Sequence, residues 1–173
     1  MSADGSKLRD VSVLADEGAV VPVEFPVSAL ARLVPELAEA SGTARGELRF
    51  GRDLGTPMAD VSVEATLSLV CQRCMRPMSQ PVSTGSRVYF PADETAAARL
   101  PPEAETMLAP DGRVRLTDVV GEELLLAVPL APRHDDEEDC EARTAPAFGN
   151  ASASEEPRRP FANLAELMGR EKR

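Results

Sequence analysis

An alternating run of apolar and polar side chains between Asp60 and Gln72 constrains the fold of this chain more than any other feature. The odd-numbered positions from 61 to 71 are apolar and end with Cys71, whereas the even-numbered positions are polar except Val70. Strict alternation over this length is typical of an antiparallel strand that buries one face. The pattern therefore predicts a long, half-buried strand with Cys71 at its end, on the apolar face.

The residues after this strand predict a hairpin with a cysteine pair at its turn. Cys74 follows Cys71 after two residues, Pro77 helps to close the turn, and residues 82–90 return as a second strand. Residues 46–52 and 20–25 predict two more strands. Pro22 lacks the N–H group that a central strand needs, so the strand over 20–25 is expected at a sheet edge.

Two helices complete the predicted core, whereas the first ten residues are polar and are expected to fray. One helix begins after Ser28 with Leu30 and Leu33 on its buried side, and Pro35 predicts a kink or a division into two pieces. The other covers 116–128, with Thr117 or Asp118 as its cap. The sequence thus predicts an α+β fold, a mainly antiparallel sheet with two main helices and a flexible acidic C-terminal arm.

The character of the chain changes at His134, which suggests three parts in its 173 residues. We expect an α+β core domain over 1–133, an acidic segment and an Ala/Ser/Pro-rich linker over 134–159, and a short amphipathic helix over 160–173. Phe161, Leu164 and Leu167 form the apolar stripe of that helix. The stripe either packs on the protein's own core or binds a groove in a partner.

The net charge of −10 argues against a large phosphate-binding surface, which needs clustered Lys and Arg. Two pairs of arginines remain candidates for local contacts with a partner, Arg49 with Arg52 and Arg73 with Arg76, because a guanidinium pairs well with phosphate or carboxylate. The acidic residues 135–139 are either a solvated loop or a counter-charge for a basic partner.

Cys71, Cys74, His134 and Cys140 provide the nitrogen and sulfur ligands of a possible zinc site. Two alternatives stay open. The thiols can remain reduced, one of them packing in the core, or the pair can exchange disulfides. Exchange is less well supported, because redox C-x-x-C motifs normally open a helix rather than end a hairpin.

Other features favour a non-enzymatic cytoplasmic protein. Three cysteines are too few for a disulfide framework at this length, which indicates a reducing compartment. The sequence shows no basic segment followed by an apolar run at its start, and no apolar stretch long enough for a membrane span. A single His in an acidic segment, without a Gly-rich phosphate loop, is weak material for catalysis.

Four segments together resemble the YceD family, the large ribosomal RNA subunit accumulation proteins. They occur in the family's order at residues 69–78, with Cys-Gln-Arg-Cys, at 118–132, at 134–140 and at 160–167. Some branches of the family carry further cysteines near the position of Cys140, which would complete a zinc site. This chain has His134 and Cys140 there.

The resemblance implies a ribosome biogenesis factor, not an enzyme, that is needed for synthesis, processing or stability of 23S ribosomal RNA. Its expected partner is ribosomal RNA or a basic ribosomal protein of the large subunit, with no membrane and no small-molecule substrate. Two other functions remain open at this point, a zinc- or thiol-dependent redox module and an escort for a basic ribosomal protein.

Overall fold

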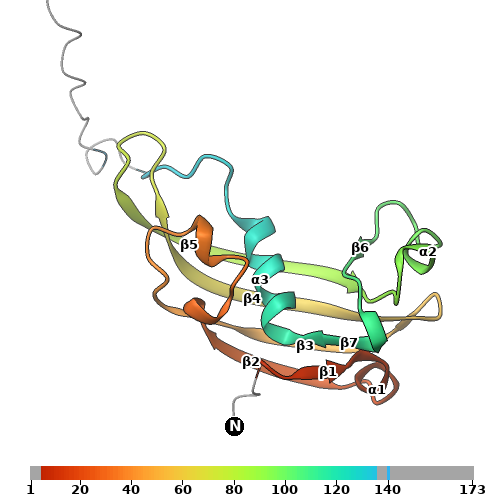
Figure 1. Cartoon of the computed structure of the whole chain (residues 1–173). Coiled ribbons are helices and arrows are strands. Elements are labelled where there is room, and N and C mark those ends of the chain that lie inside the picture. The colour runs from red at the N-terminus through yellow and green to blue at the C-terminus, as the bar shows by residue number, and fades with distance from the viewer. Residues whose placement is uncertain (1–4, 136–139, 141–173) are drawn as a thin grey trace, which may run out of the picture. The chain divides into compact units, whose positions relative to one another are not determined.

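A five-stranded sheet is the frame of the protein in the computed structural model, which describes residues 5–135 and Cys140 (Figure 1). Its strands follow the order β2 (Val20–Pro26), β3 (Thr43–Asp53), β4 (Thr56–Val70), β5 (Pro77–Tyr89) and β6 (Glu105–Thr106). The first four are antiparallel to their neighbours, and β6 runs parallel to β5. The α+β fold with a mainly antiparallel sheet is confirmed.

The central strand β4 has the alternation that the sequence predicts. Residues 59, 61, 63, 65, 67 and 69 are at most 7% exposed, whereas Ser62, Glu64 and Thr66 face solvent. Full burial of side chains such as Leu67 and Leu69 contributes about 1.5–3 kcal/mol each. The predicted hairpin is confirmed, but β5 begins earlier than expected, with Pro77 opposite Val70. Proline is tolerated there because it is the first residue of the strand.

Helix α3 (Leu116–Ala127) packs against β4 and β5 and agrees with the prediction over 116–128. Its side chains Leu116, Val119, Val120 and Leu124 are fully buried. The predicted caps are wrong, because the N-cap is Arg115, whose side chain makes no capping bond. The Thr117 hydroxyl instead donates to the Gly5 carbonyl at 3.2 Å.

The helix predicted after Ser28 is not continuous, and the predicted division into two pieces is confirmed, since two short 3₁₀ helices occupy this segment. They are η1 (Val27–Ala29) and η2 (Val34–Glu36), and the chain leaves helical geometry between them at Leu30. Leu30 and Leu33 are nevertheless fully buried. The apolar spacing thus identified core residues, while Pro35, which cannot donate a backbone hydrogen bond, is compatible with only a short helical piece.

The expectation of a frayed N-terminus is wrong for residues 8–10. They form β1 (Leu8–Asp10), which pairs with β7 (Arg113–Arg115) in a separate two-stranded sheet. Helix α1 (Val11–Asp16) follows at once, and the Asp10 carboxylate caps it by accepting from the amides of Ser12 and Val13 at 3.0 and 3.2 Å. Two short elements complete the fold, α2 (Glu94–Ala97) and η3 (Pro110–Gly112).

The described residues belong to one unit, Met1–Glu141. Phe161, Leu164 and Leu167, the linker and the predicted C-terminal helix lie outside them, so these predictions and the division into three parts stay predictions. In the part of the chain that is described, no helix is both long and apolar enough to cross a membrane.

Candidate metal centre

The four predicted ligands, Cys71, Cys74, His134 and Cys140, come together at the far end of the β4–β5 hairpin. Their ligand atoms all lie within 4.8 Å of one another. Cys71 Sγ is 3.7 Å from Cys140 Sγ, and Cys74 Sγ is 3.6 Å from His134 Nδ1. Residues separated by 69 positions in the sequence thus share one cluster.

These separations fit a tetrahedral ion. Zinc binds sulfur at about 2.3 Å and nitrogen at about 2.0 Å, so tetrahedral angles place neighbouring ligand atoms about 3.5–3.8 Å apart. The two printed contacts have this length already, and the widest pair needs to close by about 1 Å. Because the chain supplies four ligands, the geometry suits a structural ion better than a catalytic one, which keeps an open position.

The turn after β4 positions the first two ligands. Cys71 continues the inward-facing register of the strand and is fully buried. The Met75 amide donates to the Cys71 carbonyl, and the Cys71 amide donates to the Arg76 carbonyl, both at 2.9 Å. Met75 closes the turn with a φ of 58°, in the left-handed region. This tight turn directs the Arg73 amide at Cys71 Sγ, 3.4 Å away.

The chain segment after α3 supplies the other two ligands. The Gln72 amide donates to the Pro132 carbonyl at 2.8 Å, which fixes this segment beside the C-x-x-C turn. His134 follows two residues later and is half-buried, and Cys140 is 3% exposed. The side chain of Met78 packs against the three cysteines. The cluster therefore joins two otherwise separate segments.

The environment shifts the pKa values of Cys71 and Cys140 in opposite directions. Burial raises the pKa of Cys71, but hydrogen bonds from the backbone amides of Cys74 and Arg73 and contacts with His134 outweigh it and lower this pKa to about 5. Burial raises the pKa of Cys140 to about 11, and its hydrogen bonds with Cys74 and Cys71 act in the same direction. One buried thiolate is thus favoured in this cluster without a metal, and a thiolate is the form that binds metal.

The four predicted partner-binding arginines do not form one surface. Arg73 and Arg76 are exposed on the turn beside the cluster, whereas Arg52 Nε donates to Asp16 Oδ1 at 2.6 Å and Arg49 Nε donates to Glu47 at the same distance. Arg52 pairs with Pro57 near the start of β4, so about 45 Å of strand separates it from the cluster at 3.3 Å per residue.

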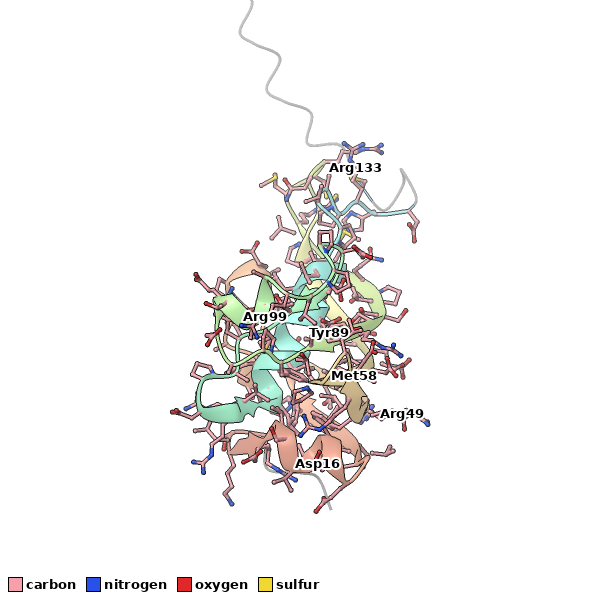
Figure 2. The ribbon with its side chains drawn as sticks, turned by 90° about the vertical axis from the view of Figure 1, so that its right-hand side faces the viewer. Asp16, Arg49, Met58, Tyr89, Arg99 and Arg133 are labelled. Atoms are coloured by element: carbon pink, nitrogen blue, oxygen red, sulfur yellow. The ribbon has the colours of Figure 1, made fainter. Side chains whose placement is uncertain are left out.

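Arg133 is a neighbour of the cluster that the sequence prediction missed. It lies between Pro132 and His134, both of which contact the C-x-x-C turn. Figure 2 shows Arg133 and Asp16 at opposite ends of the protein, with Arg49 nearer to Asp16. Its position directly before a ligand was the signal in the sequence.

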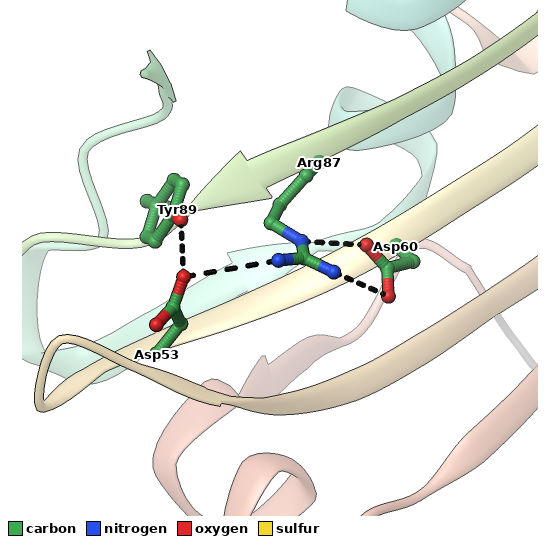
Figure 3. A network of polar contacts seen from close by, with 4 residues as sticks. All are labelled: Asp53, Asp60, Arg87 and Tyr89. Atoms are coloured by element: carbon green, nitrogen blue, oxygen red, sulfur yellow. Dashed lines mark hydrogen bonds and ion pairs between the residues drawn. The ribbon is translucent and has the colours of Figure 1, made fainter. Parts of the chain in front are cut away.

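Several arginines of the sheet lie beside carboxylates. Arg87 Nε donates to Asp60 Oδ1 at 2.8 Å, and Tyr89 and Arg87 both contact Asp53 (Figure 3). The hydrogen bond to Asp53 raises the pKa of Tyr89. Three more arginines of the sheet form ion pairs, Arg45 with Glu24, Arg49 with Glu47 and Arg52 with Asp16. These pairs offset the positive charge of the arginines on this part of the sheet.

Comparison with known families gives a match over the part of the chain that contains the cluster. Residues 59–168, more than half of the chain, match the family described as large ribosomal RNA subunit accumulation protein YceD. The chain belongs to the YceD family. The matched range contains Cys71, Cys74, His134, Cys140 and helix α3, and the resemblance predicted from the sequence is confirmed. No solved structure matches the chain significantly.

Proposed function

We propose that this YceD-family protein is a cytoplasmic ribosome biogenesis factor that maintains the level of 23S ribosomal RNA by binding rather than by catalysis. The family match carries the proposal, because it extends over the cysteine pair, α3 and both later ligands. The four-ligand cluster supports binding over catalysis, since a site filled by protein ligands has no position for a reacting water. In this proposal the factor acts on synthesis, processing or stability of the RNA.

A bound zinc is the cofactor that fits this function. Cys71, Cys74, His134 and Cys140 would hold it, and the ion would supply structural cross-linking of the hairpin turn to the segment after α3. The 3.7 and 3.6 Å ligand separations and the backbone hydrogen bond at Cys71 support this assignment.

A deletion strain tests the biogenesis function. Loss of the gene should lower 23S RNA relative to small-subunit RNA and reduce large subunits in sedimentation profiles. The wild-type gene should restore both, and so should a variant with Arg49→Gln, whose side chain lies away from the cluster. Normal RNA levels and normal subunit profiles in the deletion strain would refute the proposal.

Elemental analysis of the full chain, purified without chelator, tests the zinc. We expect about one zinc per chain, as for a closed structural site, and a strong reduction in Cys74→Ser. A folded wild-type chain with a zinc ratio near zero would exclude a structural zinc while leaving the biogenesis function untouched.

A second candidate is an escort for a basic ribosomal protein of the large subunit. The observation that favours it is the acidic run 135–139 in a chain of net charge −10. Escort predicts complex formation with a basic partner that weakens steeply with salt and is lost when these five acids are neutralised. If neutralisation leaves the complex intact, the escort function is wrong.

A thiol redox function is the third reading, and the low pKa of Cys71 is its support. The full burial of this thiol opposes it, because reactive cysteines are normally accessible. Thiol titration decides between them. Redox activity requires Cys71 or Cys74 to react faster than a model thiol at neutral pH, and equal or slower reaction rules it out.

A further inference from the structure

Two chain segments form a shared surface around the metal centre. We call residues 71–76 and 130–134 the tip. The hydrogen bond from Gln72 to Pro132 and the contact between Cys74 and His134 join the segments. In Figure 1 the loop between β4 and β5 and the segment after α3 lie at the same end of the protein. Neither segment has the surface of the tip without the other.

The tip concentrates guanidinium groups and exposed apolar side chains. Arg73, Arg76 and Arg133 are all exposed. Met75, which has left-handed backbone geometry, is 60% exposed, and Leu130 is fully exposed. Among the described residues from 71 to 76 and from 130 to 135, Asp135 is the one carboxylate.

We propose that the tip is the surface through which the protein contacts RNA, with its three arginines on phosphates and Met75 and Leu130 against an unpaired nucleotide. The inference rests on the proposed function for RNA as the partner. The guanidinium fork matches phosphate oxygens bidentately. Side chains can reach the bases of unpaired loops and bulges, but they cannot reach the bases in the deep major groove of an RNA helix.

The composition of the tip predicts how this binding behaves. The described tip has no Phe, Tyr or Trp, and the ring of His134 is held in the cluster, so base stacking contributes little and phosphate contacts dominate the affinity. Three contacts with single-stranded RNA give a slope of log affinity against log salt of about −2. Affinity should therefore fall about 20-fold between 50 and 200 mM salt.

The metal centre connects the proposed surface to the fold. The cluster holds Arg133 in the same surface as Arg73 and Arg76 by fixing His134 and Cys74 together. Removal of zinc should therefore weaken RNA binding through loss of the shared surface, although no zinc ligand touches RNA. A structural role of this kind predicts that added zinc restores the binding.

Fluorescence anisotropy with the full chain and labelled fragments that tile large-subunit ribosomal RNA tests the inference. The double variant Arg73→Gln, Arg76→Gln should bind the best fragment about 25-fold more weakly at 0.1 M salt, and its salt slope should fall to about −0.7. Arg133→Gln should weaken binding about fivefold. The matched control Arg49→Gln, Arg52→Gln removes the same charge at the other end of the sheet and should have no effect.

Two further measurements keep the test decisive if a tip variant folds poorly. Zinc content and melting temperature identify such a variant, and ultraviolet cross-linking of the wild-type chain to the same fragments needs no variant. Cross-linked peptides should contain residues 72–76 or 130–133. Cross-links confined to the sheet, or equal effects of the two double variants, would overturn the inference.

Neutralising the acidic residues 135–139 distinguishes an RNA partner from a basic protein partner, because binding should strengthen for RNA and weaken for a basic protein. Changing Asp135 and residues 136–139 to Asn or Gln removes negative charge next to Arg133 in the sequence, so RNA binding should strengthen. Weaker RNA binding would contradict the inference. If the full chain binds no fragment while its deletion still lowers 23S RNA, the tip inference fails and the biogenesis function stands.

Discussion

Gly46 is a position at which one added methyl group should destabilise the whole sheet. It lies in β3 between Val23 of β2 and Val63 of β4. A Cβ atom at Gly46 would overlap the Ser62 carbonyl oxygen and would stand 2.7 Å from Val63 Cα. Both are backbone atoms of the central strand, so no side-chain rotation relieves the overlap.

The cost follows from the movement that this overlap requires. Ordinary contact distances need β3 and β4 to separate locally by about 1 Å, which stretches ladder hydrogen bonds from about 2.9 Å beyond their useful range. One or two unsatisfied backbone groups cost about 1–3 kcal/mol each. Alanine recovers about 0.4–1 kcal/mol through a less flexible unfolded chain. We therefore expect Gly46→Ala to lower the free energy of unfolding by about 2–3 kcal/mol.

Gly85 is the matched control in the same sheet. It lies in β5 opposite Ser62, and an added Cβ there meets no atom within 4 Å. Gly85→Ala should be neutral or stabilising by up to about 1 kcal/mol. Urea unfolding followed by far-ultraviolet circular dichroism gives both values. If the two variants have unfolding free energies within about 0.5 kcal/mol of each other, the account of strand crowding at Gly46 is wrong.

Three further predictions concern α3, the metal centre and α1. Burial raises the pKa of Glu123, whose carboxylate accepts from the hydroxyls of Ser86 and Thr84. The stability that the protonated Glu123 side chain contributes is therefore complete below the pKa of the unfolded state and is lost as pH rises through the pKa of the folded state. Glu123→Gln should flatten the fall in unfolding free energy above pH 4.5 in urea titrations. Chelation should lower the melting temperature of the wild type but not of Cys140→Ser, since a ligand at 1,000 times its dissociation constant stabilises by about 4 kcal/mol. Asp10→Ala should cost about 1 kcal/mol in the same unfolding assay, because α1 loses its cap.

The central hairpin was predictable because its information is local. The alternation over the fifteen residues of β4 predicts the strand itself, the face that is buried, and the inward position of the following Cys71. The ligand types and the C-x-x-C spacing then suggested the cluster that the structure brings together. What sequence alone did not contain was the Gln72–Pro132 hydrogen bond that aligns the segment after α3.

The N-terminal elements were missed because their pairing is non-local. β1 contributes three residues, and its partner β7 lies about a hundred residues later, so no periodic pattern was long enough to detect. α1 did have a signal, with Asp10 as cap and Val11, Leu14 and Ala15 at helical spacing. The segment after Ser28 is the reverse case, because its apolar spacing identified core residues and Pro35 correctly indicated two short pieces in place of one helix.

Ion pairs that form in the fold also decide what the net charge of −10 means for a partner. Arg49 and Arg52 looked available in the sequence, but the fold places Glu47 and Asp16 against them. Paired charges nearly cancel at a distance, and the Debye length at physiological salt is about 8 Å. The sheet end near Arg52, about 45 Å of strand from the tip, therefore exerts little force on a polyanion there. The charge that matters is local, which is why the effect of neutralising residues 135–139 tests the partner better than total charge does.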